Sequence, residues 1–301
     1  MTAEIAPQSP TLGQWIAGAR PRTLPAAVSP VVAASGIAFF EGAFSGWLAL
    51  LALIVGVSLQ VGVNYANDYS DGIRGTDAVR IGPLRLVGSG LARPGTVMIA
   101  AFAYFAVAGM AGVVLVWAAQ QWWLLAVGAA AILAAWYYTG GKRPYGYLGL
   151  GEVAVFVFFG LVATCGTGYV QTGRVSLPLF LLGIGVGALA CAILVANNLR
   201  DIEGDRVAGK HTLATRIGDP ATRNLYLMLV ILATLMIITV AVLTSWWALS
   251  GLVGLLLIIP AVRVVVSGGR GRDLITVLKV TGLAELIASV ALTAGLVAAG
   301  V

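Results

Sequence analysis

Long apolar runs dominate this chain of 301 residues and determine the solvent in which it folds. Hydrophobic residues make up 59% of the sequence and charged residues only 10%. A water-soluble domain needs more polar surface than this composition supplies, whereas a run of about 20 apolar residues is long enough to cross a bilayer as a helix. The sequence therefore predicts an all-α integral membrane protein.

The apolar runs predict nine transmembrane helices in a single domain, residues 1–301. They cover residues 22–41, 46–67, 96–119, 122–139, 150–170, 176–198, 222–244, 246–266 and 275–300. The residues before the first run lack the basic-then-apolar order of a cleaved signal peptide, so we expect a short N-terminal tail. Cys165 and Cys191 lie inside apolar runs without CxxC spacing, and we expect them only to pack.

The distribution of positive charge predicts the orientation of the chain. With a cytoplasmic N-terminus, all but one of the 18 Lys and Arg residues fall on the cytoplasmic side, and the exception is Arg174. This is the bias of the positive-inside rule, and it places the C-terminus outside. The net charge of +6 reflects this excess and suits an anionic lipid leaflet, so it is no argument for a nucleic-acid partner.

Two acidic clusters stand at the cytoplasmic ends of apolar runs. One extends from Asn64 to Asp71 and the other from Asn197 to Asp205, and they open two long connections, at about 68–95 and 199–221. Carboxylates next to hydrocarbon are costly to keep charged. Positions 64, 68 and 71, like positions 197, 201 and 205, recur every three or four residues, so each set shares one helix face. This matched spacing indicates an internal duplication and predicts that the two faces meet.

The ligand types favour magnesium over zinc or copper. Carboxylate and amide oxygens are hard donors, the only histidine is His211, and neither thiol is placed to help. Magnesium is usually held by one or two carboxylates and a substrate phosphate, so the clusters predict a phosphorylated or diphosphorylated partner. The candidate metal ligands are Asn64, Asn67, Asp68, Asp71, Asp77, Asn197, Asp201 and Asp205. An ion-coupled transporter is the alternative from another class, although its acids usually lie near the bilayer midplane.

Four segments resemble the UbiA superfamily of intramembrane prenyltransferases. They are residues 20–27, 64–77, 142–152 and 197–213, and the last is the most specific because its paired Asn, Arg-Asp and Gly-Lys-x-Thr-Leu follow one another. Within the superfamily the resemblance is greatest to the branch that acts on 1,4-dihydroxy-2-naphthoate in menaquinone biosynthesis. One departure concerns the motif NDxxDxxxD, because Gly75 stands where the last acid is expected and Asp77 is the nearest substitute.

The resemblance implies nine helices around a central cavity that opens sideways to lipid and is capped by cytoplasmic loops. It implies a magnesium-dependent enzyme of the bacterial cell membrane, with its active site facing the cytoplasm. A polyprenyl group would pass from polyprenyl diphosphate to 1,4-dihydroxy-2-naphthoate with loss of carbon dioxide and diphosphate, giving demethylmenaquinol. Another aromatic acceptor, namely a benzoate, homogentisate, or a haem or chlorophyll ring, remains the alternative.

The resemblance also implies roles for individual residues. The expected catalytic residues are Asp68, Asp71, Asp201, Asp205 and Lys142. The expected substrate-binding residues are Arg22, Asn64, Asn67, Tyr65, Tyr138, Arg143, Tyr145, Asn197, Asn198, Arg200 and Lys210. The cations would hold the departing diphosphate, and the tyrosines would face an allylic cation. Gly183 and Gly187, spaced as small-xxx-small, are expected to let helices pack closely.

Overall fold

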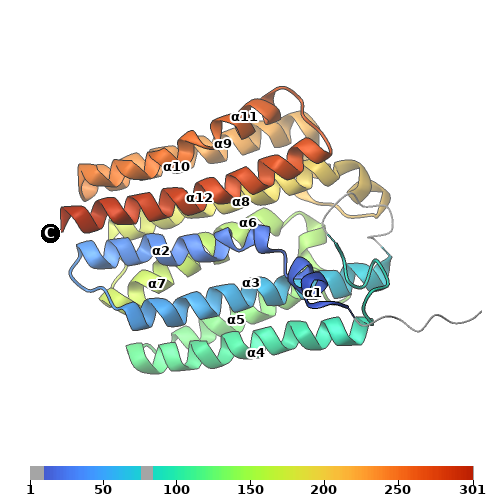
Figure 1. Cartoon of the computed structure of the whole chain (residues 1–301), viewed down its shortest axis with the longest axis horizontal. Helices are drawn as coiled ribbons and strands as arrows, with labels where there is room; N and C mark the ends of the chain where they lie inside the picture. The colour runs from blue at the N-terminus through green and yellow to red at the C-terminus, as the bar shows by residue number, and fades with distance from the viewer. Residues whose placement is uncertain (1–9, 76–83, 301) are drawn as a thin grey trace, which may run out of the picture.

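The computed structural model describes residues 10–75 and 84–300, and every regular element within them is a helix (Figure 1). The all-α fold class is therefore confirmed, while Asp77 lies outside the described residues. The α-helices are α1 (Leu12–Gly18), α2 (Pro25–Phe40), α3 (Gly46–Arg74), α4 (Pro94–Ala119), α5 (Leu124–Tyr137), α6 (Gly151–Val155), α7 (Ala163–Thr172), α8 (Leu177–Val207), α9 (Leu213–Leu243), α10 (Leu252–Leu256), α11 (Ile259–Val266) and α12 (Arg272–Ala299). Four further helical segments are η1 (Pro21–Thr23), η2 (Tyr145–Leu148), η3 (Phe156–Val162), which is a π-helix, and η4 (Trp246–Gly251).

Six of these helical segments are long and apolar enough to cross a membrane. They are residues 46–74, 94–119, 151–172, 177–207, 213–243 and 272–299. Two bent pairs, 12–23 with 25–40 and 246–256 with 259–266, raise the number to eight if each pair is one span, and α5 is a shorter apolar helix. Every predicted run therefore has a helical counterpart among the described residues, whereas nine as a count of spans stays a prediction.

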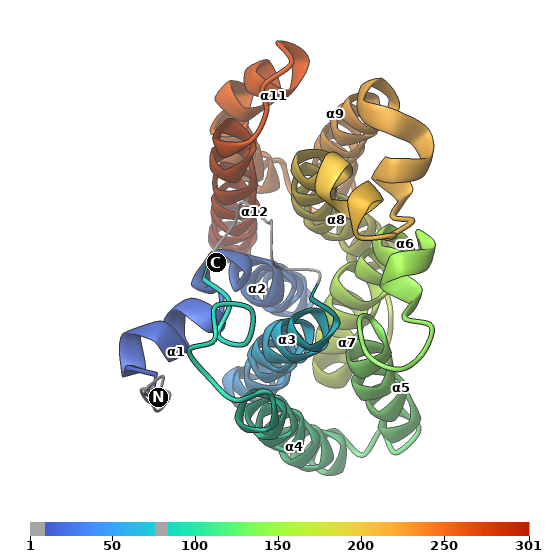
Figure 2. The same cartoon turned by 90° about the vertical axis from the view of Figure 1, so that its right-hand side faces the viewer.

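The long helices lie side by side, with successive helices running back and forth (Figure 1). In the view along them, α2 and α8 lie in the middle, with α3, α4, α5 and α7 on one side and α9, α11 and α12 on the other (Figure 2). The largest hydrophobic core joins α2 and α8 to α9 and α12. The half of the molecule that contains α3, α4, α5 and α7 instead encloses a cavity.

The two polar connections are shorter than predicted, because the helices continue through the acidic clusters. Helix α3 is capped at its start by the Ser45 hydroxyl and ends only at Gly75, whose φ of 70° lies in the left-handed region that favours glycine. Helix α8 continues to Val207, and the hydroxyl of Thr212 caps the start of α9. The predicted loop boundaries at 68 and 199 are therefore wrong. The carboxylates of Asp68, Asp71 and Asp201 have partners inside the protein, so these acids are accommodated within helices.

Close packing of glycines joins the π-helix η3 to α8. A Cβ atom added to Gly160 would lie 2.5 Å from the Cα of Gly187 and 2.9 Å from the carbonyl oxygen of Gly183, so only glycine fits. This confirms the packing role predicted for the two α8 glycines. Cys165 and Cys191 are both free thiols, and Cys191 donates from Sγ to the backbone carbonyl of Glu152 at 3.1 Å.

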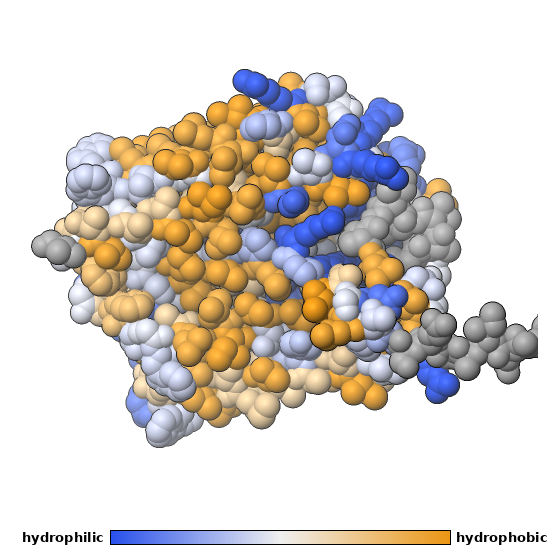
Figure 3. All heavy atoms as spheres, in the orientation of Figure 1, coloured by the Kyte–Doolittle hydropathy of each residue, from blue (hydrophilic) through white to orange (hydrophobic). Residues whose placement is uncertain are grey.

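The surface is apolar over the middle of the molecule and charged at one end (Figure 3). Exposed tryptophans stand near the other ends of the helices, namely Trp47, Trp117, Trp122, Trp123, Trp246 and Trp247. Tryptophan is enriched where a protein meets the membrane–water interface. The exposed apolar band and its aromatic rim are those of a multi-pass membrane protein.

Candidate active site between two acidic helix ends

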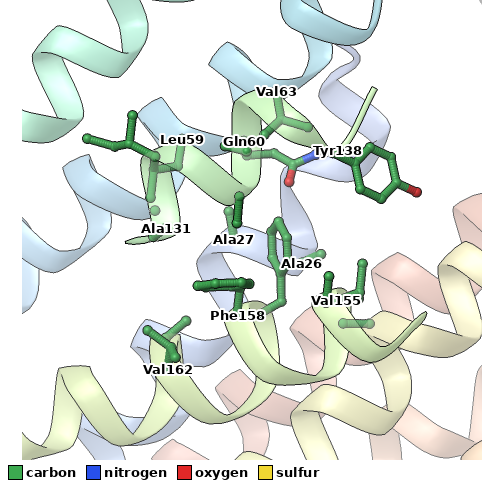
Figure 4. A pocket seen from close by; sticks show the side chains of 18 of the residues that line it. Ala26, Ala27, Leu59, Gln60, Val63, Ala131, Tyr138, Val155, Phe158 and Val162 are labelled. Atoms are coloured by element: carbon green, nitrogen blue, oxygen red, sulfur yellow. The ribbon is translucent and has the colours of Figure 1, made fainter. Parts of the chain in front are cut away.

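A cavity of about 560 Å³ lies between α2, α3, α4, α5, η3, α7 and α8 (Figure 4). Its wall is polar where α3 and α8 approach their C-terminal ends. Along the remaining length it is made of aliphatic and aromatic side chains, which include Leu59, Val63, Val113, Ile132, Phe158 and Val162. The cavity therefore joins a polar head to a long apolar body.

Helix α3 contributes Asn64, Asn67 and Asp71 to the cavity wall. Asn67 accepts a hydrogen bond at Oδ1 from the Thr139 hydroxyl at 2.7 Å. Asn64 donates from Nδ2 to the carbonyl oxygen of Ala19 at 2.8 Å. All three α3 residues are almost completely buried, so their polar groups face either a protein partner or the cavity.

Helix α8 contributes Asn197, Asn198, Asp201 and Asp205 to the same wall. The remaining acid of this cluster, Glu203, is exposed and pairs with Arg206 at 3.3 Å. The structure thus brings the cavity faces of the two clusters together and turns Glu203 away.

Asp71 connects the two halves of the polar head. Its Oδ1 accepts a hydrogen bond from Lys210 Nζ at 3.2 Å and another from the Tyr147 hydroxyl, while Arg85 Nη2 lies 3.4 Å from Oδ2. The ammonium group of Lys210 also lies 4.6 Å from the centre of the Tyr147 ring, within cation–π range. A residue that follows α8 is therefore held against a carboxylate of α3, and all four side chains border the cavity.

Asp201 is held by its neighbour Arg200. The guanidinium donates from Nε to Oδ1 and from Nη2 to Oδ2, both at 2.7 Å, and Nη2 also lies 2.8 Å from Asn197 Oδ1. Arg200 itself is not part of the cavity wall. Its contacts assign it to orienting Asp201 and Asn197 rather than to reaching a substrate.

Asp68 differs from the other clustered acids. It is fully buried and absent from the cavity wall, and its two carboxylate oxygens accept the backbone N–H groups of Leu86 at 2.7 Å and Val87 at 3.1 Å. These bonds fasten the segment before α4 to α3. The structure therefore places Asp68 where it holds a loop, which corrects the expectation that it lines the site beside Asp71.

Four further predicted site residues also lie away from the wall, namely the expected catalytic Lys142 and the expected substrate-binding residues Arg22, Tyr65 and Arg143. Tyr65 donates its hydroxyl hydrogen to the carbonyl oxygen of Trp15 at 2.8 Å and packs against the Trp15 ring. Arg22, Lys142 and Arg143 are exposed at the charged end and do not border the cavity. The structure does not bring these four residues to the site.

Other residues, which the sequence did not single out, line the polar head. They are Arg20, Gln60, Arg85, Thr139 and Tyr147. Arg20 lies in the segment that carries the family resemblance, two residues from the predicted Arg22, and its φ of 53° marks the break between α1 and η1. Arg85 belongs to the connection after the first cluster. In both cases the sequence indicated the segment but not the residue.

Tyr138 and Tyr145 border the cavity, as expected, and meet edge to face with ring centres 5.5 Å apart. The Tyr145 hydroxyl donates to the carbonyl oxygen of Ala134 at 2.8 Å. Burial raises the pKa of Tyr145 to about 12, because the phenolate would lose its hydration. Tyr145 therefore presents a neutral ring to the cavity.

The donor set fits magnesium. Asp71, Asp201 and Asp205 supply carboxylates, and the neighbouring asparagines supply amide oxygens, all of them hard ligands. Within residues 10–75 and 84–300, no three Asp, Glu, His or Cys side chains converge closely enough to hold an ion alone. Magnesium is typically bound by one or two carboxylates together with phosphate oxygens and water, so this open arrangement suits an ion that arrives with a phosphorylated substrate.

Comparison with known proteins identifies the family. The model of the UbiA prenyltransferase family matches residues 27–297. The chain is 52% identical to 1,4-dihydroxy-2-naphthoate octaprenyltransferase of Mycobacterium leprae over 96% of this chain and 98% of the relative. It is 37% identical to the Escherichia coli protein of that name over 70% of each chain.

Solved structures share the fold at low sequence identity. A UbiA homolog from Archaeoglobus fulgidus bound to GPP and Mg²⁺ superposes with a TM-score of 0.66 at 13% identity, over 92% of this chain and 99% of that one. A UbiA homolog from Aeropyrum pernix K1 superposes with a TM-score of 0.68 at 16% identity, over 92% and 98% of the two chains. The family match, the relatives and the shared fold agree, and the chain belongs to the UbiA prenyltransferase family.

Proposed function

We propose that this enzyme transfers a polyprenyl group from polyprenyl diphosphate to 1,4-dihydroxy-2-naphthoate in a magnesium-dependent reaction. The observation that carries the proposal is that two acidic helix ends and a long apolar body border the same cavity. The first substrate has the same division, with a charged head and a hydrocarbon tail. Relatives at 52% identity along almost the whole chain are named for this reaction and support the choice of acceptor.

The diphosphate belongs at the polar head. Arg20, Arg85 and Lys210 border the cavity there and carry positive charge that can bind phosphate oxygens. Lys210 and Arg85 now contact Asp71, and both are placed to exchange that carboxylate for a phosphate oxygen when the donor arrives. These residues stabilise the charge that develops on the leaving group.

Magnesium would be held by Asp71, Asp201 and Asp205, with amide oxygens of Asn64, Asn67 and Asn197. When bound, the ion supplies Lewis-acid neutralisation of the diphosphate and so makes it a better leaving group. Arg200 keeps Asp201 and Asn197 oriented toward the cavity through its fork of hydrogen bonds. Among the predicted acids that the structure describes, Asp68 has the least support for a metal role, since its oxygens already bind backbone N–H groups.

The reaction at carbon follows from this arrangement. The allylic carbon–oxygen bond of the donor breaks, and its electron pair leaves with diphosphate. The neutral rings of Tyr138 and Tyr145 stabilise the allylic cation through their π electrons. The acceptor ring forms the new carbon–carbon bond at the carbon that bears the carboxylate. Carbon dioxide then leaves, and its bonding pair restores the aromatic ring, so no base is needed at that carbon.

We also propose that the polar head faces the cytoplasm. The positive-inside bias of Lys and Arg favours this orientation, and the exposed tryptophans mark the opposite interface. The orientation can be checked with the variant Glu203→Cys. Its new thiol is treated with a membrane-impermeant reagent in right-side-out vesicles and in inverted vesicles. Labelling only in inverted vesicles supports a cytoplasmic site, and labelling only in right-side-out vesicles contradicts it.

The function is tested with isolated membranes, both substrates and controlled Mg²⁺. We expect prenylated product and carbon dioxide in equal amounts, and we expect both to disappear when EDTA removes the metal. Asp71→Ala should abolish turnover, whereas Glu203→Ala, on the exposed side of the other cluster, should leave it unchanged. Product from a benzoate or homogentisate but not from the naphthoate would assign a different acceptor. Substrate flux into vesicles without prenylated product would instead indicate a transporter.

A further inference from the structure

Thr23, at the end of η1, holds two amide side chains of α3 in a defined orientation. Its hydroxyl donates to the carbonyl oxygen of Arg20 at 3.0 Å. The same oxygen accepts from Gln60 Nε2 at 2.8 Å and from Asn64 Nδ2 at 3.0 Å. Since a hydroxyl has a single hydrogen, and the Arg20 carbonyl takes it, Thr23 can only accept from the amides. Both amides must therefore turn their NH₂ groups toward Thr23 and their carbonyl oxygens away from it.

This orientation leaves the carbonyl oxygen of Gln60 directed at the cavity. Gln60 is only 7% exposed and borders the cavity, and its side chain points into it between Ala26, Val63 and Phe158 (Figure 4). Among the hydrogen bonds found within the described part of the chain, Gln60 takes part through Nε2, as donor to Thr23, and Oε1 is left to the cavity side. An amide oxygen among apolar side chains loses stabilisation unless it finds a donor. The missing donor is therefore expected from a ligand.

The location of Gln60 indicates which ligand this is. Gln60 precedes Asn64, the deepest of the proposed metal ligands on α3, by one helical turn, so it lies roughly 6 Å deeper along the helix than that end of the metal site. A donor bound by its diphosphate at the acids presents only hydrocarbon at this depth, and hydrocarbon has no hydrogen to donate. Of the two substrates, the aromatic acceptor alone carries hydroxyl groups that could reach Gln60.

The surroundings suit a flat ring. Ala26 and Ala27 of α2 are small, and Phe158 projects into the cavity from the opposite wall (Figure 4). Phe158 belongs to the π-helix η3, a distortion that often occurs at functional sites because it redirects side chains. The small alanines and the Phe158 ring leave an apolar slot with one hydrogen-bond acceptor at its edge.

We propose that Gln60 Oε1 accepts a hydrogen bond from a ring hydroxyl of the aromatic acceptor, and that Thr23 is the positioning residue that orients this amide. The inference rests on the proposed function, since it assigns the second substrate of the same site. It predicts that Gln60 affects recognition of the acceptor and leaves recognition of the prenyl diphosphate unchanged, whereas Thr23, which also holds Asn64, affects recognition of the acceptor through Gln60.

The test compares steady-state kinetics of the full chain in membranes while each substrate is varied in turn. In Gln60→Leu we expect the apparent KM for 1,4-dihydroxy-2-naphthoate to rise about tenfold, because a buried group that pairs with a substrate hydroxyl is lost. The KM for the donor and the Mg²⁺ requirement should stay within about twofold of the unaltered chain. Thr23→Val should also raise the KM for the acceptor, whereas Thr23→Ser, which keeps the hydroxyl, should leave that KM near the value of the unaltered chain. Thr167→Val, which removes another hydroxyl from the cavity wall, serves as the control.

A second measurement uses acceptors in which one ring hydroxyl is methylated. The unaltered enzyme should discriminate against one methoxy isomer, and Gln60→Leu should lose that discrimination. An unchanged acceptor KM in Gln60→Leu, or a rise confined to the donor KM, overturns the inference and leaves water as the partner of Gln60. Failure of the unaltered chain to prenylate any aromatic acceptor would instead refute the proposed function.

Discussion

Lys210 Nζ lies 3.2 Å from Asp71 Oδ1, although 139 positions of the chain separate the two residues. Both side chains are buried, so this ion pair is not a solvent-screened surface contact. Removing both charges from water costs free energy that their mutual attraction often fails to repay, so a buried ion pair is weak evidence of a purely stabilising role. Here it keeps an ammonium group and a carboxylate together at the polar head of the cavity, where we propose that the diphosphate binds.

Lys210→Met should weaken use of the donor. We expect kcat/KM for the prenyl diphosphate to fall about 10- to 100-fold, because a charge-assisted contact to the leaving group is lost. Steady-state assays in membranes measure this. Lys142→Met is the matched control, since Lys142 is exposed away from the cavity wall. An equal loss in both variants would show that the effect comes from membrane insertion.

Replacing Asp68 or Asp71 by Asn should affect two different properties, namely stability for Asp68 and the Mg²⁺ requirement for Asp71. Asp71→Asn should raise the Mg²⁺ concentration needed for activity. Asp68→Asn should instead lower the free energy of unfolding by about 1–3 kcal/mol, because one of two buried N–H groups loses its carboxylate partner. Thermal melts in detergent and Mg²⁺ titrations separate the two outcomes. A shifted Mg²⁺ requirement in a normally stable Asp68→Asn protein would return Asp68 to the metal site.

Gly160→Ala should destabilise the contact between η3 and α8. The added methyl group would lie 2.5 Å from Gly187 Cα, and backbone cannot yield as a flexible side chain does. We expect a loss of about 1–3 kcal/mol, typical of overpacking in a tight interior. Gly166→Ala provides the comparison, since open space surrounds the position of its Cβ atom. Similar melting temperatures for the two variants would contradict the tight packing.

Large side chains in the apolar body should shorten the accepted tail. Gly128 and Gly166 border the cavity, and an added Cβ at either position meets nothing within 4 Å. Gly166→Phe should therefore reduce turnover of a long polyprenyl diphosphate while leaving a short donor, such as a geranyl diphosphate, almost unaffected. Competition between donors of different length, resolved by mass spectrometry, measures the preference. An equal reduction for both donors would place the tail elsewhere.

Tyr145→Phe should leave the pH dependence of turnover unchanged across neutral pH. The raised pKa of about 12 keeps the phenol protonated well above this range, so it gives up no proton that catalysis could use. The aromatic ring remains in the variant, and only the hydrogen bond to the Ala134 carbonyl is lost. pH–rate profiles of both proteins check this, and loss of an alkaline limb in the variant would assign a titrating role to Tyr145.

The helical positions of the first cluster explain both what could be predicted and what could not. With about 100° between successive residues, Gln60, Asn64, Asn67 and Asp71 fall within roughly 60° of one another around α3. Asp68 lies roughly 60° from Asp71 and about 40° outside that sector. Spacing therefore identified the helix and its polar face, and it could have revealed Gln60, four residues before Asn64. It could not say that the segment at Leu86 would cover Asp68.

The cations show the same limit. Arg20 and Arg22 stand two residues apart in one polar segment, so neither charge nor spacing distinguishes them. Arg20 has a left-handed backbone conformation and separates helix α1 from η1. Its side chain borders the cavity, whereas Arg22 is exposed. Lys142 and Arg143 belong to a segment that carries the family resemblance, yet the residues of that segment that border the cavity are Tyr145, Gly146 and Tyr147.

By itself the sequence determined the membrane class, the helices and the two clusters, because hydropathy and helical spacing are local properties that survive without tertiary contacts. The tertiary structure alone decided which acid lines the cavity, which arginine reaches it and that Lys210 meets Asp71. Those outcomes depend on how helices rotate about their axes and on which connection covers which face. Packing between segments distant in the chain sets both, and no local pattern encodes it.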